Sequence, residues 1–326
     1  LVGRESVAFR ASMPILGEEC FAECVNLEAV PMSERARLSI ETIERKAFSG
    51  CKSLAQFITS AFRGVKTIDA YAFSDCDSLA NPSIPASVTW IGEGLFSECE
   101  NIQTVSFYCV LEEYPKDCFK NCPKLKRTGG VAGALSGLKK IGESAYEGCI
   151  SLETNERWDV GKYVNLEEIG EDGFKDCRQL TFLKLPASMK KIGEGAFDGS
   201  SSIRQVNFYS AAVPEMGRIG LDGLSDSFCI KVPDSQAEDD RVYKAYLAVF
   251  TEMFGGNRAY EVLDSISDGA KERNRPEVSA ADRQLSETVS GADISENGVR
   301  LPKQGVQLDE NREEADKKEG NGLEKN

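Results

Sequence analysis

Ile91-Gly92-Glu93-Gly94-Leu95-Phe96-Ser97-Glu98-Cys99-Glu100-Asn101-Ile102 is the stretch that decides the fold, because its pattern returns along most of the chain. Its apolar residues Ile91, Phe96, Cys99 and Ile102 fall at relative positions 1, 6, 9 and 12. The same template begins at residues 16, 43, 68, 91, 114, 141, 169 and 192, so that neighbouring copies are 23 to 28 residues apart. Eight copies of so short a unit predict a solenoid, in which each repeat packs against its neighbours.

The stretch Leu180-Thr181-Phe182-Leu183-Lys184-Leu185-Pro186 indicates how one repeat is built. Its leucines alternate with polar residues as in a half-buried strand, and the proline ends the strand because it has no N–H to donate. A second extended piece leads to Ile192, Gly193 permits a sharp corner, and a short helical turn places Phe197 in the core. We therefore predict an α/β solenoid of the leucine-rich-repeat type. It is a right-handed coil with a parallel sheet on its concave face and short helical or irregular turns on the other side.

Two motifs carry a resemblance to a known family. Ile192-Gly193-Glu194-Gly195-Ala196-Phe197 and Leu185-Pro186-Ala187-Ser188 resemble the consensus of the BspA-like leucine-rich repeat, and the resemblance covers about residues 16–208. It implies an extracellular or cell-surface protein that acts in adhesion and binding. Residues 211–263, with an amphipathic helix at 242–250, resemble the C-terminal closure of that family.

The composition limits the function. The 326 residues include no histidine, which excludes Ser-His-Asp and Cys-His catalysis and histidine ligation of a metal. No pair of carboxylates or nucleophile with its base stands out, so we expect no enzyme activity and no cofactor. The net charge of -14 gives no electrostatic support for binding nucleic acid or an anionic membrane. No run approaches the roughly 18 apolar residues of a membrane span.

The eleven cysteines follow the repeat. Seven of them hold position 9 of the template, where the eighth copy has Ser200. A position that accepts Cys or Ser predicts a small buried site, and we expect a ladder of reduced thiols there. Disulfides along the ladder are the alternative, although stacked rungs lie about 4.8 Å apart and a disulfide needs converging Cβ atoms about 3.8 Å apart. The Cys20/Cys24 and Cys118/Cys122 pairs are four rungs apart, too far to share one zinc ion.

Three segments follow from these patterns. Residues 1–210 are predicted to be the solenoid, and residues 211–263 a degenerate last repeat with a helical cap. Residues 264–326 contain no aromatic residue and no cysteine, and their many charges predict a disordered tail or linker.

Two rungs carry long connections, between Leu125 and Ile141 and between Leu152 and Ile169. Insertions in a solenoid form loops, often on the binding face, and the second one brings Trp158 and Tyr163 as possible aromatic anchors. Packing of Trp158 over the sheet is an equally good interpretation, and Trp90 is expected to be structural. The strand registry adds outward-facing candidates from the principal strands: Gln103, Lys126, Arg127, Phe182, Lys184 and Arg204.

The sequence therefore predicts a non-catalytic module that binds another protein or a surface glycan through its concave face. The alternative is a purely structural spacer that displays another segment of the protein. The pattern does not identify the ligand or the oligomeric state.

Overall fold

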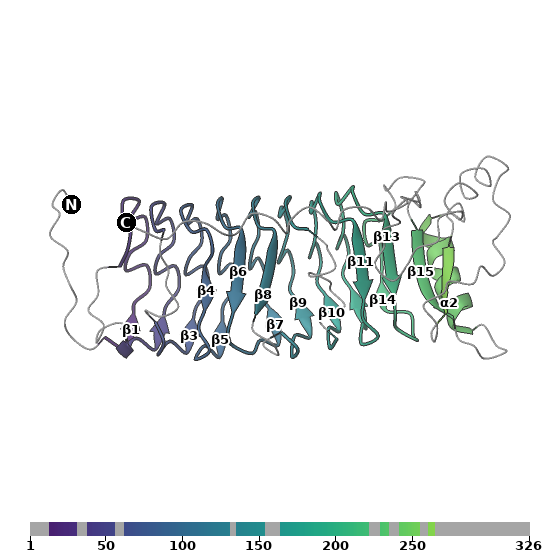
Figure 1. Ribbon diagram of the computed structural model, residues 1–326, viewed down its shortest axis with the longest axis horizontal. Helices are drawn as coiled ribbons and strands as arrows, with labels where there is room; N and C mark the ends of the chain where they lie inside the picture. The colour runs from purple at the N-terminus through teal and green to yellow at the C-terminus, as the bar shows by residue number, and fades with distance from the viewer. Residues whose placement is uncertain are drawn as a thin grey trace, which may run out of the picture. The chain divides into compact units, whose positions relative to one another are not determined.

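The structure is a computed structural model that describes residues 13–30, 38–55, 62–130, 135–153, 164–221, 229–234, 241–254 and 260–264. In it the repeats stack in chain order as the rungs of a parallel β-solenoid (Figure 1). Each rung has a short strand, a tight turn and, in most rungs, a second strand. The predicted repeat solenoid is confirmed. The predicted segment boundaries at 210 and 263 stay predictions, and the tail after Asp264 lies outside the described residues.

The first sheet system, here called the short-strand ladder, is made of two-residue strands. Within each strand the second residue points into the core and the first points outward. All pairings between these strands are parallel. Its members are β1 (Ile15–Leu16), β2 (Thr42–Ile43), β3 (Thr67–Ile68), β5 (Trp90–Ile91), β7 (Glu113–Tyr114), β9 (Lys140–Ile141), β10 (Glu168–Ile169), β12 (Lys191–Ile192) and β14 (Glu215–Met216).

The second sheet system, here called the principal sheet, holds the longer strands. Its two parts follow the orders β4-β6-β8 and β11-β13-β15-β16, again with parallel pairing. In the first two rungs no principal strand forms over 26–30 and 52–55, contrary to the expected one strand per rung. Its members are β4 (Ser83–Ile84), β6 (Thr104–Phe107), β8 (Arg127–Gly130), β11 (Phe182–Leu185), β13 (Gln205–Phe208), β15 (Cys229–Asp234) and β16 (Tyr260–Asp264).

The segment after each short strand is a tight turn, and the expected helical turn is wrong. Gly94 and Glu98 have φ values of 62° and 63°, in the left-handed region, and the equivalent residues of the other rungs do the same. These turns bond from rung to rung: in this one the N–H of Phe96 donates to the carbonyl of Cys118 at 2.9 Å. Glycine is required at Gly92 for another reason, because a Cβ there would lie 2.4 Å from the backbone nitrogen of Ala70.

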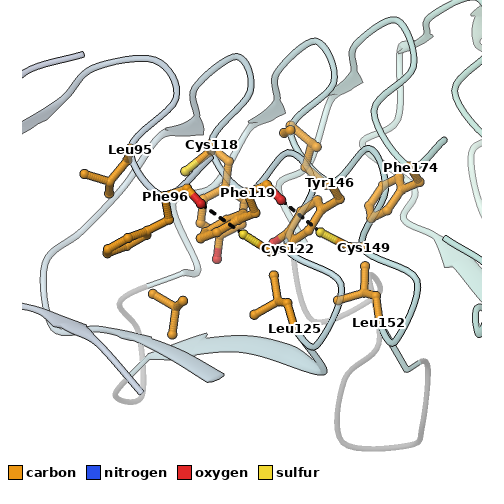
Figure 2. Close-up of a cluster of buried hydrophobic side chains, with 14 of the residues drawn as sticks. Leu95, Phe96, Cys118, Phe119, Cys122, Leu125, Tyr146, Cys149, Leu152 and Phe174 are labelled. Carbon is orange, nitrogen blue, oxygen red and sulfur yellow. Dashed lines mark hydrogen bonds between the residues drawn. The ribbon is translucent and has the colours of Figure 1, made fainter. Parts of the chain in front are cut away.

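The core between the two sheet systems consists of columns of identical or similar side chains. One column is a stack of rings from Phe21 to Phe197, in which adjacent centroids lie 5.1 to 6.3 Å apart. The cysteines of template position 9 form the neighbouring column. Figure 2 shows Phe96, Phe119, Tyr146 and Phe174 beside the thiols of Cys122 and Cys149.

The two rungs at Tyr114 and Tyr146 depart from the phenylalanine and isoleucine pattern. Both phenols are fully buried, and the hydroxyl of Thr128 lies 2.7 Å from that of Tyr146 and 3.4 Å from that of Tyr114. Thr128 occupies the register position of Val105 on the next strand, and Gly130 that of Phe107. The two tyrosines therefore lie where the adjacent strand carries smaller side chains, and the hydroxyl of Thr128 is their polar partner.

At the C-terminal end of the solenoid, helix α2 (Arg241–Phe254) packs on the core. Tyr246 and Phe250 lie 5.4 and 5.5 Å from the ring of Phe208. The hydroxyl of Tyr246 donates to the carbonyl of Ser210 at 2.9 Å. The helix thus covers the last phenylalanine of the principal sheet, as a cap must.

Candidate binding surfaces and the family

The predicted binding band lies on the outward side of the principal sheet. Gln103, Lys126, Arg127 and Arg204 are exposed, and Phe182 and Lys184 are half-buried. Alternation along β11 explains this placement, since Leu183 and Leu185 take the inward positions. Arg127 stands opposite Thr104 in the register, and Phe182 opposite Gln205. Whether this band binds anything stays a prediction.

Two details of the band differ from a simple alternating strand. The ammonium of Lys184 lies 5.6 Å from the centroid of the Phe182 ring, so that the phenylalanine is partly covered by its own strand. Asn207 is buried although its position predicts an outward side chain. In the register it stands between Lys184 and Lys231, and the side-chain amide of Gln205 donates to it at 2.8 Å. Trp158 and Tyr163 lie outside the described residues.

Basic side chains gather on this outward side. Lys126, Arg127, Lys184 and Arg204 come from three rungs of a chain whose net charge is -14. Of their carboxylate neighbours, Glu153 lies 3.9 Å from Lys126, at the limit of an ion pair. The band is therefore a basic surface on an acidic protein.

The outward side of the short-strand ladder is a second surface, and its two halves differ. From β1 to β5 the outward residues are uncharged: Ile15, Thr42, Thr67 and Trp90. From β7 to β14 they alternate in charge: Glu113, Lys140, Glu168, Lys191 and Glu215.

The charged half is largely self-neutralised. Lys140 pairs with Glu168 at 3.4 Å, and Lys191 with Glu215 at 3.8 Å. The residues just before these strands repeat the alternation, with ion pairs of 3.2 Å between Glu112 and Lys139 and of 2.7 Å between Glu167 and Lys190. The rungs at 112/113, 139/140 and 167/168 thus carry two like charges and face two opposite charges on the next rung, whereas Lys190 and Lys191 are followed by Pro214 and Glu215. This pattern is visible in the sequence and was missed there.

Trp90, for which a structural role is expected, lies on the outward side of the short-strand ladder. The residue is 56 % exposed, because in a two-residue strand the residue before the inward Ile91 must point outward.

The short-strand ladder is interrupted between β5 and β7. In other rungs the residue after the short strand donates its N–H to the previous rung, as Gly92 does to Ile68 at 2.8 Å. At the next rung that residue is Pro115, which has no N–H to donate to Ile91.

The thiols of the core column make a directed contact that explains their exchange with serine. The Sγ of Cys122 donates to the carbonyl of Phe96 at 3.0 Å, and that of Cys149 to the carbonyl of Phe119 at 3.1 Å (Figure 2). The Oγ of Ser200 makes the same bond to Phe174 at 2.7 Å. The position therefore needs a small donor as well as a small volume.

Burial also makes these thiols poor nucleophiles. Desolvation raises the pKa of Cys51 to about 12 and the pKa of Cys99, Cys122 and Cys149 well above its ordinary value. No disulfide joins the cysteines in the described part of the chain. No cluster of three metal-ligating side chains occurs among the residues that the structure covers.

The comparison with protein families decides the relationship. The model of the BspA type leucine rich repeat region matches residues 14–153 and 134–219, in six copies. These matches span 14–219, well over half of the 326 residues. This chain belongs to the BspA-type leucine-rich repeat family. The family recognised from the motifs is confirmed, and the rungs described above are its repeats.

Solved structures of bacterial repeat proteins are similar to this BspA-type chain. A leucine rich cell surface protein of Faecalibacterium prausnitzii is 19% identical, with 68% of this chain and 71% of that chain covered and a TM-score of 0.40. A leucine-rich repeat protein of Eubacterium ventriosum is 22% identical, covers 57% and 56%, and has a TM-score of 0.46. The pneumococcal vaccine antigen PcpA is 17% identical, covers 72% and 67%, and has a TM-score of 0.40. A comparison with curated proteins finds no match.

Within the described residues no helix is long and apolar enough to cross a membrane.

Proposed function

We propose that this BspA-type repeat protein is a non-catalytic binding and adhesion module outside the cell or on its surface. Its partner, a protein or a surface glycan, carries negative charge where it docks. The location is supported by the family and by the cell-surface description of the Faecalibacterium prausnitzii protein.

The observation that carries the proposal is the basic band of the principal sheet. A surface with an excess of positive charge on a protein of negative net charge attracts a negatively charged partner and orients it. Both arginines are exposed: Arg127 is the first residue of β8, and Arg204 directly precedes β13, where its backbone N–H donates to the carbonyl of Thr181 at 2.9 Å. Arginine binds carboxylates and phosphates in bidentate fashion. Strands hold these side chains more firmly than loops do, which reduces the entropy lost on binding.

An unbiased pull-down from surface material of neighbouring cells tests the proposal. The wild type is compared with Arg127→Glu/Arg204→Glu, and the matched control is Arg178→Glu/Lys244→Glu, the same charge change at exposed sites away from the band. A specific partner that is retained by the wild type and the control, lost by the band variant and released by salt supports the proposal. Equal recovery by all three proteins would contradict it and favour the spacer alternative.

A further inference from the structure

A second recognition site lies on a different surface, at the junction between the two halves of the short-strand ladder. Trp90 ends the uncharged half, and Glu113 begins the charged half on the next rung. Both residues directly precede an inward residue, Ile91 or Tyr114, so both side chains point to the same outer side. Hydrogen bonds join the turns of these two rungs, among them the bond of 2.8 Å from the N–H of Gly94 to the carbonyl of Lys116.

Glu113 differs from Glu168 and Glu215, the other acidic residues of the ladder, because its carboxylate forms no ion pair among the described residues. In the register it faces Lys140, yet Lys140 pairs with Glu168 on its far side. Glu112, its neighbour in the chain, pairs with Lys139. Among the described residues Glu113 has no ion pair, so its carboxylate is a free acceptor on the rung that follows the exposed indole of Trp90.

The side chain of Trp90 is also exposed on this surface. More than half of its surface is exposed, and its register partner on the preceding rung is the small Thr67. Thr89 adds an exposed hydroxyl beside it, which donates to the carbonyl of Lys66 at 3.2 Å and keeps its lone pairs for another donor. An exposed tryptophan on a rigid strand is the kind of residue that dominates binding energy.

We propose that Trp90 and Glu113 form a binding site for a neutral glycan. The indole face offers a flat apolar surface for the C–H side of a pyranose ring, and the carboxylate accepts hydrogen bonds from two adjacent hydroxyl groups of that ring. The uncharged column of Ile15, Thr42 and Thr67 extends the site along neighbouring rungs. An acidic glycan is disfavoured because the free charge at the site is negative and the chain has a net charge of -14.

The residue composition of this surface argues against a protein partner at this place. A stable protein interface covers about 800 Å² on each side around an apolar centre. Here one tryptophan stands among threonines and carboxylates, a pattern that suits a ligand rich in hydroxyl groups. The site is on the other sheet system from the basic band, so the proposal does not depend on the proposed function.

The test uses the full chain with Trp158→Phe, which leaves Trp90 as the single tryptophan. Cellohexaose, mannohexaose and chitohexaose are the neutral probes, and polygalacturonate is the acidic comparison. We expect a saturable change in tryptophan fluorescence with at least one neutral hexasaccharide and a weaker response to polygalacturonate. Glu113→Gln weakens that binding at least about fivefold, whereas the control Glu112→Gln, whose residue is already paired, changes it less than about twofold.

Calorimetry then tests the aromatic residue without relying on its fluorescence. Trp90→Ala weakens binding at least about tenfold, and Trp90→Tyr keeps most of it because a ring remains. Arg178→Ala, at an exposed turn position outside both surfaces, leaves oligosaccharide binding unchanged, which excludes a general effect of substitution. The proposal is overturned if no neutral hexasaccharide binds saturably, if Trp90→Ala binds as well as its parent, or if the response reflects self-association of the chain.

Discussion

The two halves of the short-strand ladder share an inner side and differ on the outer side. Leu16, Ile43 and Ile68 in the first half are as completely buried as Ile141 and Ile169 in the second. The outward partners are uncharged in one half and alternate between glutamate and lysine in the other. Core packing therefore restricts the residue type at the inward position of each two-residue strand and does not restrict it at the outward position. The outward strand residues form ion pairs in one half and are uncharged in the other, where Glu41 and Lys66, just before β2 and β3, pair at 2.9 Å.

The largest expected effect tests whether the inner sides of the two halves are equivalent. Phe73→Ala and Phe174→Ala each remove a fully buried ring from the same column, one in each half. Both are expected to lower the free energy of unfolding by about 3–5 kcal/mol in denaturant titrations. Glu98→Ala, at an exposed turn position, is the control, with an expected loss within about 0.5 kcal/mol. A large loss in one half and a small loss in the other would break the equivalence.

The next effect concerns the charged half alone. Lys139→Glu/Lys140→Glu replaces two ion pairs by repulsion from the rungs on both sides, and it is expected to cost about 2 kcal/mol at low salt. The loss should shrink in about 0.5 M salt because exposed charges are screened. Adding Glu112→Lys and Glu168→Lys restores opposite neighbours and should recover part of the stability. A loss that ignores salt and is not recovered would mean that the lysines act through packing.

The next effect comes from the thiol column, which continues through both halves. Since burial raises the pKa of Cys99 and Cys122, each thiol keeps its proton in the folded state at a pH where it ionises in the unfolded chain. The stabilisation is complete below the unfolded pKa of about 8.5 and is lost as the pH rises above it, by about 1.4 kcal/mol per pH unit and thiol. Denaturant titrations between pH 7.5 and 10 should show this fall.

Cys99→Ser should make that fall less steep, because it removes one titrating thiol and keeps the donor that Ser200 provides in its own rung. Cys24→Ser, at an exposed thiol, is the control and should leave the slope nearly unchanged. An equal change of slope in both variants would contradict the assignment of the steepness to buried thiols.

The smallest effect tests whether the outward positions of the uncharged half tolerate substitution without loss of stability. Thr67→Glu changes an outward residue of β3 and is expected to alter stability by no more than about 0.5 kcal/mol, measured by thermal unfolding. The equivalent Lys140→Glu should cost more, since it disrupts an ion pair. Equal effects of the two substitutions would remove the distinction between the halves.

The spacing of residues such as Ile91, Phe96 and Cys99 predicted the repeat, its inward columns and the family. Core packing explains this success, since an inward position accepts few residue types and repeats them. Outward positions carry no such constraint, and the structural role expected for Trp90 stays a prediction. The period of two in a strand places Trp90 on the outward side, because Ile91 points inward. The Glu-Glu pair at 112 and the Lys-Lys pair at 139 show the charge alternation in the sequence itself.

Other features could not be predicted because they depend on contacts between rungs. The left-handed turn residues include Tyr71, Asp117 and Ser144, which have no common side chain from which the backbone could be inferred. The partial cover of Phe182 by Lys184 and the burial of Asn207 depend on the neighbouring strand. Trp158 and Tyr163, the aromatic candidates from the insertion, stay predictions.

The central claim is that Trp90 is kept on the ladder for recognition and contributes little to the fold. The most direct test is the free energy of unfolding of Trp90→Ala, compared with the wild type by denaturant titration. An exposed side chain opposite a threonine predicts a change within about 0.5 kcal/mol and an unchanged cooperativity. A loss of about 2 kcal/mol or more would show that the indole packs as part of the structure and would contradict the account.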